Sequence, residues 1–294
     1  MFKQLNTGDK LFTVFNYALL TLVICLMLYP LIYVLSASFS NPEKMLQGEL
    51  WLFPTDFTLE SYSLAFQNRD IWIGYRNTIF YTFLGTAINL IMSIMIAYPL
   101  SRSDFYGRGP ITAFIMVTMF FSGGMIPTYL LVRDLGMVDT IWAMVIPGAV
   151  SVYNVIIMRT FFQNIPEEIR EAASIDGSTN LNFLIRIVLP LSVPIIAVMA
   201  LFYGVGHWNA YFDGLIYLRD SDRYPLQLFL REMLIQDDMS AMTTSGTEGV
   251  AKHLLRIEGL KYAVVVIASL PMLIIYPFLQ KYFIKGVMIG SLKG

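Results

Sequence analysis

The chain has 294 residues, of which 56% are hydrophobic and only 14% are charged, and its mean hydropathy is +0.61. A soluble domain carries about a quarter charged residues, so this composition excludes an ordinary soluble protein and indicates an integral membrane protein. The net charge of -1 provides no basic surface for nucleic acid, and the single cysteine, Cys25, excludes a disulfide within the chain.

Six runs of apolar residues are long enough to cross a membrane as helices, which takes about 20 residues each. The first run exceeds the apolar core of a secretory signal, so we expect an uncleaved anchor. Prolines and the pair Gly123-Gly124 inside the runs indicate kinked helices that line a cavity. The sequence therefore predicts an all-α integral membrane protein, one domain over 1–294, with six transmembrane helices over 11–35, 77–100, 110–132, 140–162, 190–216 and 261–283.

Basic residues near the ends of the runs indicate the orientation. With the N-terminus in the cytoplasm, half of the 20 basic residues lie inside, so the count alone does not decide. The basic residues on the cytoplasmic side lie in short segments next to the runs. Most of those on the other side lie in one long segment, where the positive-inside rule carries less weight. We expect both termini in the cytoplasm and extracytoplasmic segments over 36–76 and 217–260.

Polar candidates for a transport path lie within or beside the runs, where a polar group left in lipid is costly. Aromatic rings and amides at membrane depth can line a path for a polar solute. The alternative is that these side chains form an interfacial aromatic belt and bonds between helices. The candidates are Asn89, Asn154, Trp208, Asn209 and Tyr211, while His207 is expected to pack or to form a hydrogen bond inside the protein.

A polar, helix-forming segment over 167–194 separates the fourth and fifth runs. Asn164 is a candidate N-cap for its first helix, and Pro166 suits the first turn. Gly177 predicts the end of that helix, because glycine adopts the positive φ that a helix terminus requires. Ser178 or Thr179 is then the candidate cap of a second short helix.

One face of the first helix in this segment carries Glu168, Glu171 and Ile175 at helical spacing. Ala172 and Ala173 permit close approach to another surface. A helix of about ten residues is marginal alone in water, so its order must come from packing. The segment is predicted to be a compact knob with an acidic tip, exposed to the cytoplasm.

The run Glu171-Ala172-Ala173-x-x-Asp176-Gly177, with Leu189-Pro190 and Pro194 after it, resembles the EAA loop of ABC-importer permeases. Similarity extends to Trp208-Asn209, Pro225-Leu226 and the tail over 286–294. Over essentially its whole length the chain resembles carbohydrate-uptake permeases of the MalG-like type, which have the MetI-like fold. The segments 121–129 and 276–283 resemble the LplC-type branch, which is associated with complex oligosaccharides.

This resemblance implies a permease subunit in a bacterial inner membrane, which forms half of the translocation path for an oligosaccharide, such as a uronate oligomer of the alginate or pectin type. The implied partners are a second homologous permease, two ATPase subunits and an extracytoplasmic solute-binding protein. The coupling loop over 163–190 would dock on the ATPase through Glu168, Glu171, Ala172, Ala173, Asp176, Gly177, Ile187 and Pro190. The tail over 284–294, with Gly286, Gly290 and Lys293, would lie between the ATPase subunits.

The sequence contains no phosphate-binding loop with glycines, lysine and Ser or Thr at the required spacing. Its two histidines, His207 and His253, are far apart. We therefore expect no cofactor and no catalysis in this chain, with ATP and magnesium bound by the partner ATPase. Two alternatives stay open at this point: an ion-coupled secondary transporter, or a membrane scaffold or receptor.

Overall fold

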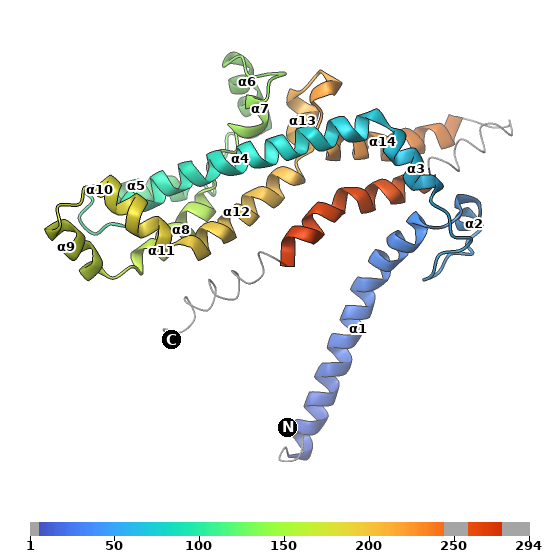
Figure 1. Cartoon of the computed structure of the whole chain (residues 1–294), viewed down its shortest axis with the longest axis horizontal. Helices are drawn as coiled ribbons and strands as arrows, with labels where there is room; N and C mark the ends of the chain where they lie inside the picture. Colours follow the sequence, from blue (N-terminus) through green and yellow to red (C-terminus); the bar gives the residue numbers. More distant parts are fainter. Residues whose placement is uncertain (1–5, 244–257, 278–294) are drawn as a thin grey trace. The chain divides into compact units, whose positions relative to one another are not determined.

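The computed structural model describes residues 6–243 and 258–277, and within these ranges all regular elements are helices (Figure 1). The expectation of an all-α membrane protein is confirmed. The longer helices are α1 (Thr7–Ser38), α4 (Arg69–Ser101), α8 (Val152–Gln163), α12 (Val193–Trp208), α14 (Leu226–Thr243) and a helix over Glu258–Pro277. The shorter helices are α2 (Pro42–Leu46), α3 (Glu60–Gln67), α5 (Arg108–Val117), α6 (Met125–Asp134), α7 (Trp142–Val145), α9 (Glu167–Ile175), α10 (Asn180–Phe183), α11 (Leu189–Leu191) and α13 (Phe212–Tyr217).

Three helices in the described ranges are long and apolar enough to cross a membrane, namely Gly8–Ser38, Arg69–Ser101 and Glu258–Pro277. They match the predicted spans over 11–35, 77–100 and the described part of 261–283. A fourth candidate consists of Asn180–Leu191 and Val193–Trp208, which are bent by 81° at Ser192. The predicted span over 190–216 is therefore not one straight helix, and α13 follows α12 as a separate element.

The predicted spans over 110–132 and 140–162 are each broken into two helices. Helix α5 ends at Val117 and α6 begins at Met125, because Gly124 adopts φ 84° and ψ 175°, a conformation that is essentially restricted to glycine. Pro147 and Gly148 lie between α7 and α8. Apolar composition predicted two continuous spans here, but the glycines and prolines interrupt the helical backbone.

Two compact units share the chain, one formed by Met1–Arg69 and Leu230–Leu270, the other by Asp70–Phe229 and Pro271–Gly294. In the first unit, a small core of Ala37, Met45 and Leu50 packs with Tyr33 and Tyr262. A bond of 2.8 Å between the hydroxyls of Ser38 and Tyr62 ties the end of α1 to α3 in this unit. Helix α3 lies within the segment over 36–76 that the sequence predicts to be extracytoplasmic.

The second unit holds the larger core, which joins α4, α8, α9, α10 and α12. Ala97, Met158 and Met199 are fully buried at its centre. The hydroxyls of Ser93 on α4 and Tyr203 on α12 lie 2.6 Å apart, which adds a polar tie between two apolar helices. Figure 1 shows α4 beside α12, with α9 and α10 beyond the Ser101 end of α4. This core positions the polar segment that the sequence singles out.

Candidate functional site

The polar segment folds as a short amphipathic helix, a tight turn and a second helical stretch. Helix α9 begins after Pro166, which has extended ψ, and its first turn carries Glu167 and Glu168, which favour the positive end of the helix dipole. The predicted cap at Asn164 is wrong. That residue instead ends α8, where its Nδ2 donates to the carbonyl oxygen of Thr160 at 3.0 Å.

The end of α9 is as the sequence predicts. Gly177 has φ 77°, and its backbone N–H donates to the carbonyl of Ser174 at 3.0 Å, while that of Ser178 donates to Ala173 at 2.9 Å. This pair of bonds is a Schellman ending, in which a left-handed residue turns the chain away from the helix axis. Thr179 then caps α10 by accepting from the backbone N–H of Asn182 at 3.3 Å.

After α10, the helix widens into a π-helical turn over Leu184–Val188 before α11. Val188 is buried in the core of the second unit, and Ile187 is packed against that core. Pro190 stands in α11 next to the bend at Ser192. Two of the predicted coupling residues, Ile187 and Pro190, therefore lie where the polar segment joins the apolar bundle.

Helix α9 has one buried face and one exposed face. Ala173 is buried in the core, and Ile169 packs partly against it. Glu171 and Ala172 are exposed, and Ile175 is 87% exposed. Glu168 and Asp176 are exposed as well. The outer face of α9 therefore presents an exposed isoleucine among carboxylates.

A cluster of charged groups, which the sequence did not predict, surrounds the base of α9. Asp104 lies in the turn between α4 and α5 and accepts from Nε and Nη2 of Arg102 at 2.8 and 2.6 Å. Arg170 on α9 donates to the same carboxylate at 3.1 Å and also pairs with Glu167. Hydrogen bonds from Arg102 hold the pKa of Asp104 well below its usual range.

Two buried amides among the substrate-path candidates face the protein interior. Asn89 is 1% exposed, and its Nδ2 donates to the carbonyl of Gly148 at 2.6 Å. Its Oδ1 lies 2.7 Å from Nε2 of His207, so both ends of the amide have protein partners. The expected role of His207 as an internal hydrogen-bonding residue is confirmed. Asn154 is also buried, in the first turn of α8.

The three remaining candidates lie at the end of α12 and just beyond it. Trp208 is 4% exposed and packs edge-on against Tyr75. Asn209 is exposed, and its Nδ2 donates to the carbonyl of Val205 at 2.9 Å. Tyr211 is 42% exposed and contacts Phe212. The structure thus separates a buried tryptophan from two accessible polar side chains.

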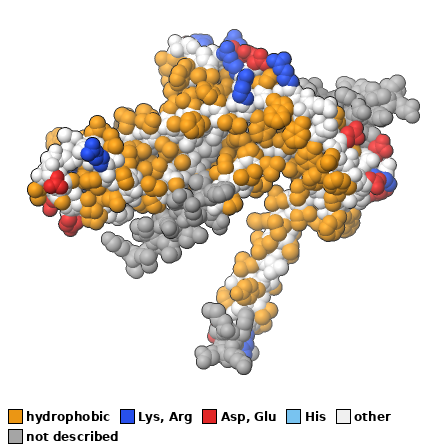
Figure 2. Space-filling view, in the orientation of Figure 1, with side chains coloured by type: hydrophobic (Ala, Val, Ile, Leu, Met, Phe, Trp, Pro, Cys, Tyr) orange, Lys and Arg blue, Asp and Glu red, His pale blue; other side chains and the backbone are white. Residues whose placement is uncertain are grey.

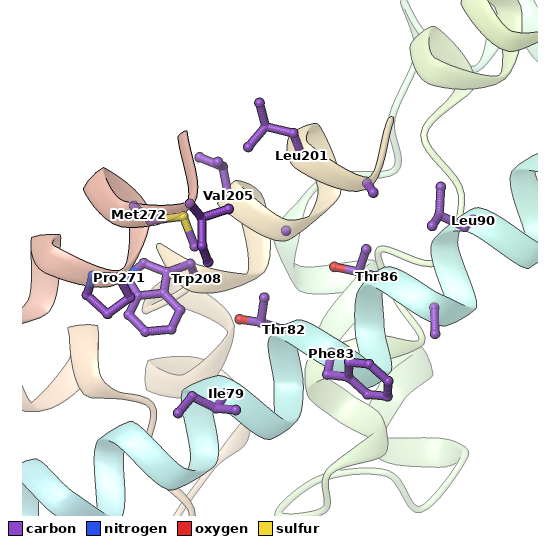
Figure 3. Close-up of a pocket in the computed structure, with 14 residues that line it drawn as sticks. Ile79, Thr82, Phe83, Thr86, Leu90, Leu201, Val205, Trp208, Pro271 and Met272 are labelled. Atoms are coloured by element: carbon purple, nitrogen blue, oxygen red, sulfur yellow. The ribbon is translucent and has the colours of Figure 1, made fainter. Parts of the chain in front are cut away.

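A cavity of about 560 Å³ opens between α4, α12 and the helix Glu258–Pro277 (Figure 3). Thr82 and Thr86 are among its lining residues, but their hydroxyls are buried and have no hydrogen bond in the described part of the chain. A saccharide needs convergent polar groups, which this apolar lining does not supply. The labelled lining residues are Ile79, Thr82, Phe83, Thr86, Leu90, Leu201, Val205, Trp208, Pro271 and Met272.

Charged side chains are sparse on the second unit. Figure 2 shows apolar atoms over most of its visible face, with charged atoms near α9 and near α6 and α13. In residues 6–243 and 258–277, no group of three or more His, Cys, Asp or Glu side chains could hold a metal ion. The predicted tail residues Gly286, Gly290 and Lys293 lie outside the described residues, as does the rest of 278–294.

Comparison with known proteins identifies relatives along nearly the whole chain. Residues 71–289 match the family model of the binding-protein-dependent transport system inner membrane component. The polygalacturonan/rhamnogalacturonan transport system permease protein YtcP of Bacillus subtilis (strain 168) is 40% identical, over 97% of this chain and 99% of its own. Protein LplC of the same organism is 42% identical, over 98% of this chain and 96% of its own.

A solved structure has the same fold. It is the crystal structure of a bacterial ABC transporter involved in the import of the acidic polysaccharide alginate. The matching chain has a TM-score of 0.86 and 34% sequence identity, and the match covers 95% of this chain and 99% of that one.

Proposed function

Because this chain belongs to the family of binding-protein-dependent transport system inner membrane components, we propose that it is the permease subunit of an ABC importer for acidic oligosaccharides. Membership of this family makes the chain a transport component of a bacterial inner membrane rather than an enzyme. It also implies partnership with an ATPase and a solute-binding protein.

The finer assembly belongs to the proposal. The chain pairs with a second, homologous permease, and each of the two binds one ATPase subunit, which holds ATP and magnesium. Both termini lie in the cytoplasm, so that α9 faces the ATPases while the segments 36–76 and 217–260 face the binding protein. The tail over 284–294 lies between the ATPase subunits, with Gly286, Gly290 and Lys293 in it.

The observation that carries the coupling role is the two-sided construction of α9. Ala173 fixes the helix to the core, while Glu171, Ala172 and Ile175 are left on the outside. Such a helix can be pushed by a partner and pass the movement to the bundle. In the docked state, Glu171 pairs with a basic side chain of the ATPase, Ile175 fills an apolar pocket of it, and the turn at Asp176-Gly177 sets the direction of approach.

The acidic nature of the substrate rests on two independent relatives. YtcP is named for polygalacturonan and rhamnogalacturonan, and the transporter of the solved structure imports alginate. Both polygalacturonan and alginate are polymers of uronic acids, so the shared chemical feature is a carboxylate on each uronate ring. Within this chain, Asn209 and Tyr211 are the accessible candidates for the path. In this proposal the buried residues Asn89, Asn154 and Trp208 do not contact the substrate. They stabilise the packing of the helices that form the path.

The experiment is reconstitution of the chain with its partner permease, ATPase and binding protein in liposomes. Oligogalacturonate should stimulate ATP hydrolysis and accumulate inside the vesicles. The fully methyl-esterified oligogalacturonate has the same rings without the charge and should do neither. Equal stimulation by the two compounds would refute the acidic substrate class but leave the permease role intact.

The same vesicles distinguish an ABC importer from an ion-coupled transporter. Uptake by the complex should stop when ATP is omitted and should continue when an ionophore collapses the ion gradients. Uptake that needs a gradient and no ATP would contradict the proposed function as a whole.

A further inference from the structure

We propose that Asp104 clamps the coupling helix α9 to the end of α4, so that a displacement imposed on α9 by a partner is carried into α4. This inference rests on the proposed function and names a positioning residue for it. Asp104 touches neither the substrate nor the ATPase in this scheme. It acts through two arginines, Arg102 just past the end of α4 and Arg170 on α9.

One carboxylate makes both connections. Its two oxygens accept from Nε and Nη2 of Arg102, just past the end of α4, at 2.8 and 2.6 Å. Oδ2 also lies 3.1 Å from Nη1 of Arg170, on α9. The bidentate pair with Arg102 fixes the orientation of the carboxylate, since the planar guanidinium matches it at two points. Arg170 therefore meets a fixed acceptor rather than a freely rotating one.

Arg102 extends the same connection to α10. Its Nη1 donates to Oδ1 of Asn180 at 2.9 Å and to the hydroxyl of Tyr98 at 3.1 Å. The Tyr98 hydroxyl in turn donates to the carbonyl of Asn180 at 3.4 Å. The side chain of Arg102 is only 14% exposed, so water competes little for these bonds. The helices on both sides of the Gly177 turn are thus held to one end of α4.

The apolar attachment of α9 is small, because it consists of Ala173, which is buried, and Ile169, which is only partly buried against the same core. Hydrogen bonds are directional, so the contacts through Asp104 add a fixed orientation to this apolar packing. Partly exposed ion pairs contribute little to overall stability. We therefore expect loss of Asp104 to change the coupling between helices and to leave the fold intact.

A matched control is available in the pair Arg133–Asp134. Oδ1 of Asp134 lies 2.9 Å from Nη2 of Arg133, and the two residues are neighbours on α6. This pair has the same chemistry as Asp104 with its arginines but joins no second element. Asp134→Asn removes an equivalent surface carboxylate and should not affect coupling.

The first test measures the distance between α9 and α4 in the full complex. Spin labels are placed at Ser174→Cys on α9 and Met95→Cys on α4, both exposed, in a Cys25→Ser background. With the parent chain and with Asp134→Asn, the distribution should be narrow and should stay unchanged on addition of ATP and magnesium. With Asp104→Asn the distribution of distances between the two labels should broaden, or should shift on addition of ATP and magnesium. A distribution as narrow and as constant with Asp104→Asn as with the parent would overturn the inference.

The second test measures substrate transported per ATP hydrolysed, with oligogalacturonate as the probe. Asp104→Asn should lower this ratio about threefold to tenfold while the complex still co-purifies, and Asp104→Glu should restore part of it. An unchanged ratio with Asp104→Asn overturns the inference. If the parent complex shows no ATP-driven uptake, the proposed function fails, and the distance measurement still decides whether Asp104 clamps α9.

Discussion

The backbone N–H of Ser178 donates to the carbonyl oxygen of Ala173 at 2.9 Å, and the chain can close this bond because Gly177 has φ 77°. Ala173 is also the residue that buries α9 in the core. The turn and the buried anchor of α9 therefore share one residue. A change in the turn should alter how α9 is held, even though Gly177 itself is exposed.

Gly177→Ala should reduce transport by straining this turn. An added Cβ at Gly177 would meet no atom within 4 Å, so the whole penalty is conformational. Holding a non-glycine residue in the left-handed region costs about 1–2 kcal/mol, and asparagine tolerates it better than alanine. Uptake into vesicles should therefore fall in the order Gly177, Gly177→Asn, Gly177→Ala. Gly109→Ala, in α5 with equal space and no positive φ, is the control and should transport normally.

Glu171→Ala should uncouple ATP hydrolysis from transport. If Glu171 is buried against a basic side chain of the ATPase, its removal strands that charge and costs about 2–5 kcal/mol of binding. Co-purification with the ATPase and substrate-stimulated hydrolysis should both fall, while Asp134→Ala, which removes an exposed carboxylate on α6, should change neither. Normal stimulation in Glu171→Ala would show that the contact lies elsewhere on α9.

Much of the polar segment was predictable because its signals are local. Pro166, Gly177 and Thr179 act on the backbone within a few residues, and the predicted end of α9 is confirmed. Asn164 misled the prediction, because a short polar side chain can serve either end of a helix. In the structure its Nδ2 donates to the carbonyl of Thr160, at the end of α8.

Contacts between distant residues were not predictable. Asp104 and Arg170 are 66 positions apart, and Asn89 and His207 are 118 apart. Periodicity says which face of a helix is polar and does not say which partner meets it. The broken spans have a different cause: a hydropathy window counts apolar residues on both sides of Gly124 and ignores the backbone there.

Asn89→Leu should destabilise the bundle without changing substrate affinity. The substitution removes two hydrogen bonds at once and leaves the carbonyl of Gly148 and the ring of His207 without this partner. Bonds between membrane helices are worth about 0.6 kcal/mol each on average, so we expect a loss of about 1–2 kcal/mol. Thermal unfolding in detergent measures it. A higher KM with an unchanged melting temperature would instead place Asn89 on the substrate.

Gly85→Ala is an independent probe of the same contact. A Cβ at Gly85 would collide with the imidazole ring of His207, which packs directly on the glycine. The ring would have to move away from Asn89, so this variant should lower the melting temperature as Asn89→Leu does. Gly206→Ala, on the same helix as His207 but with open space around it, should have a much smaller effect.

Asp139 should make the loop between α6 and α7 insensitive to pH in the physiological range. Backbone N–H groups of Arg219 and Asp220 donate to its carboxylate at 3.0 and 3.2 Å, and with Arg223 nearby they lower its pKa from 3.8. Because the pKa of Asp139 is lower in the folded protein, its contribution to stability is complete at pH values above its pKa in the unfolded chain. That contribution is lost only as the pH falls through its pKa in the folded protein. The difference in melting temperature between the parent and Asp139→Asn should therefore be level from pH 5 to 8, a range well above this titration.

The variant Asp139→Ala should be worse than Asp139→Asn, because the residue also has φ 58°. Both N–H groups donate to the same oxygen, Oδ1, so the amide oxygen of asparagine can accept both bonds, and asparagine tolerates the left-handed conformation. Alanine does neither. Thermal unfolding separates the two variants. Equal melting temperatures would mean that the loop does not depend on this side chain.

The substrate path is best tested by comparing Trp208→Ala with Tyr211→Ala. Trp208 is 4% exposed, so its removal leaves a cavity and should cost about 3–5 kcal/mol of stability, with less protein recovered in the membrane. Tyr211 is 42% exposed, so its removal should leave stability nearly unchanged and raise the KM for oligogalacturonate uptake, as a lost stacking surface for a sugar ring would. Tyr211→Phe keeps the ring and should keep the KM. If Tyr211→Ala transports with the parent KM, the ring is not on the path, and the accessible amide of Asn209 becomes the next residue to replace.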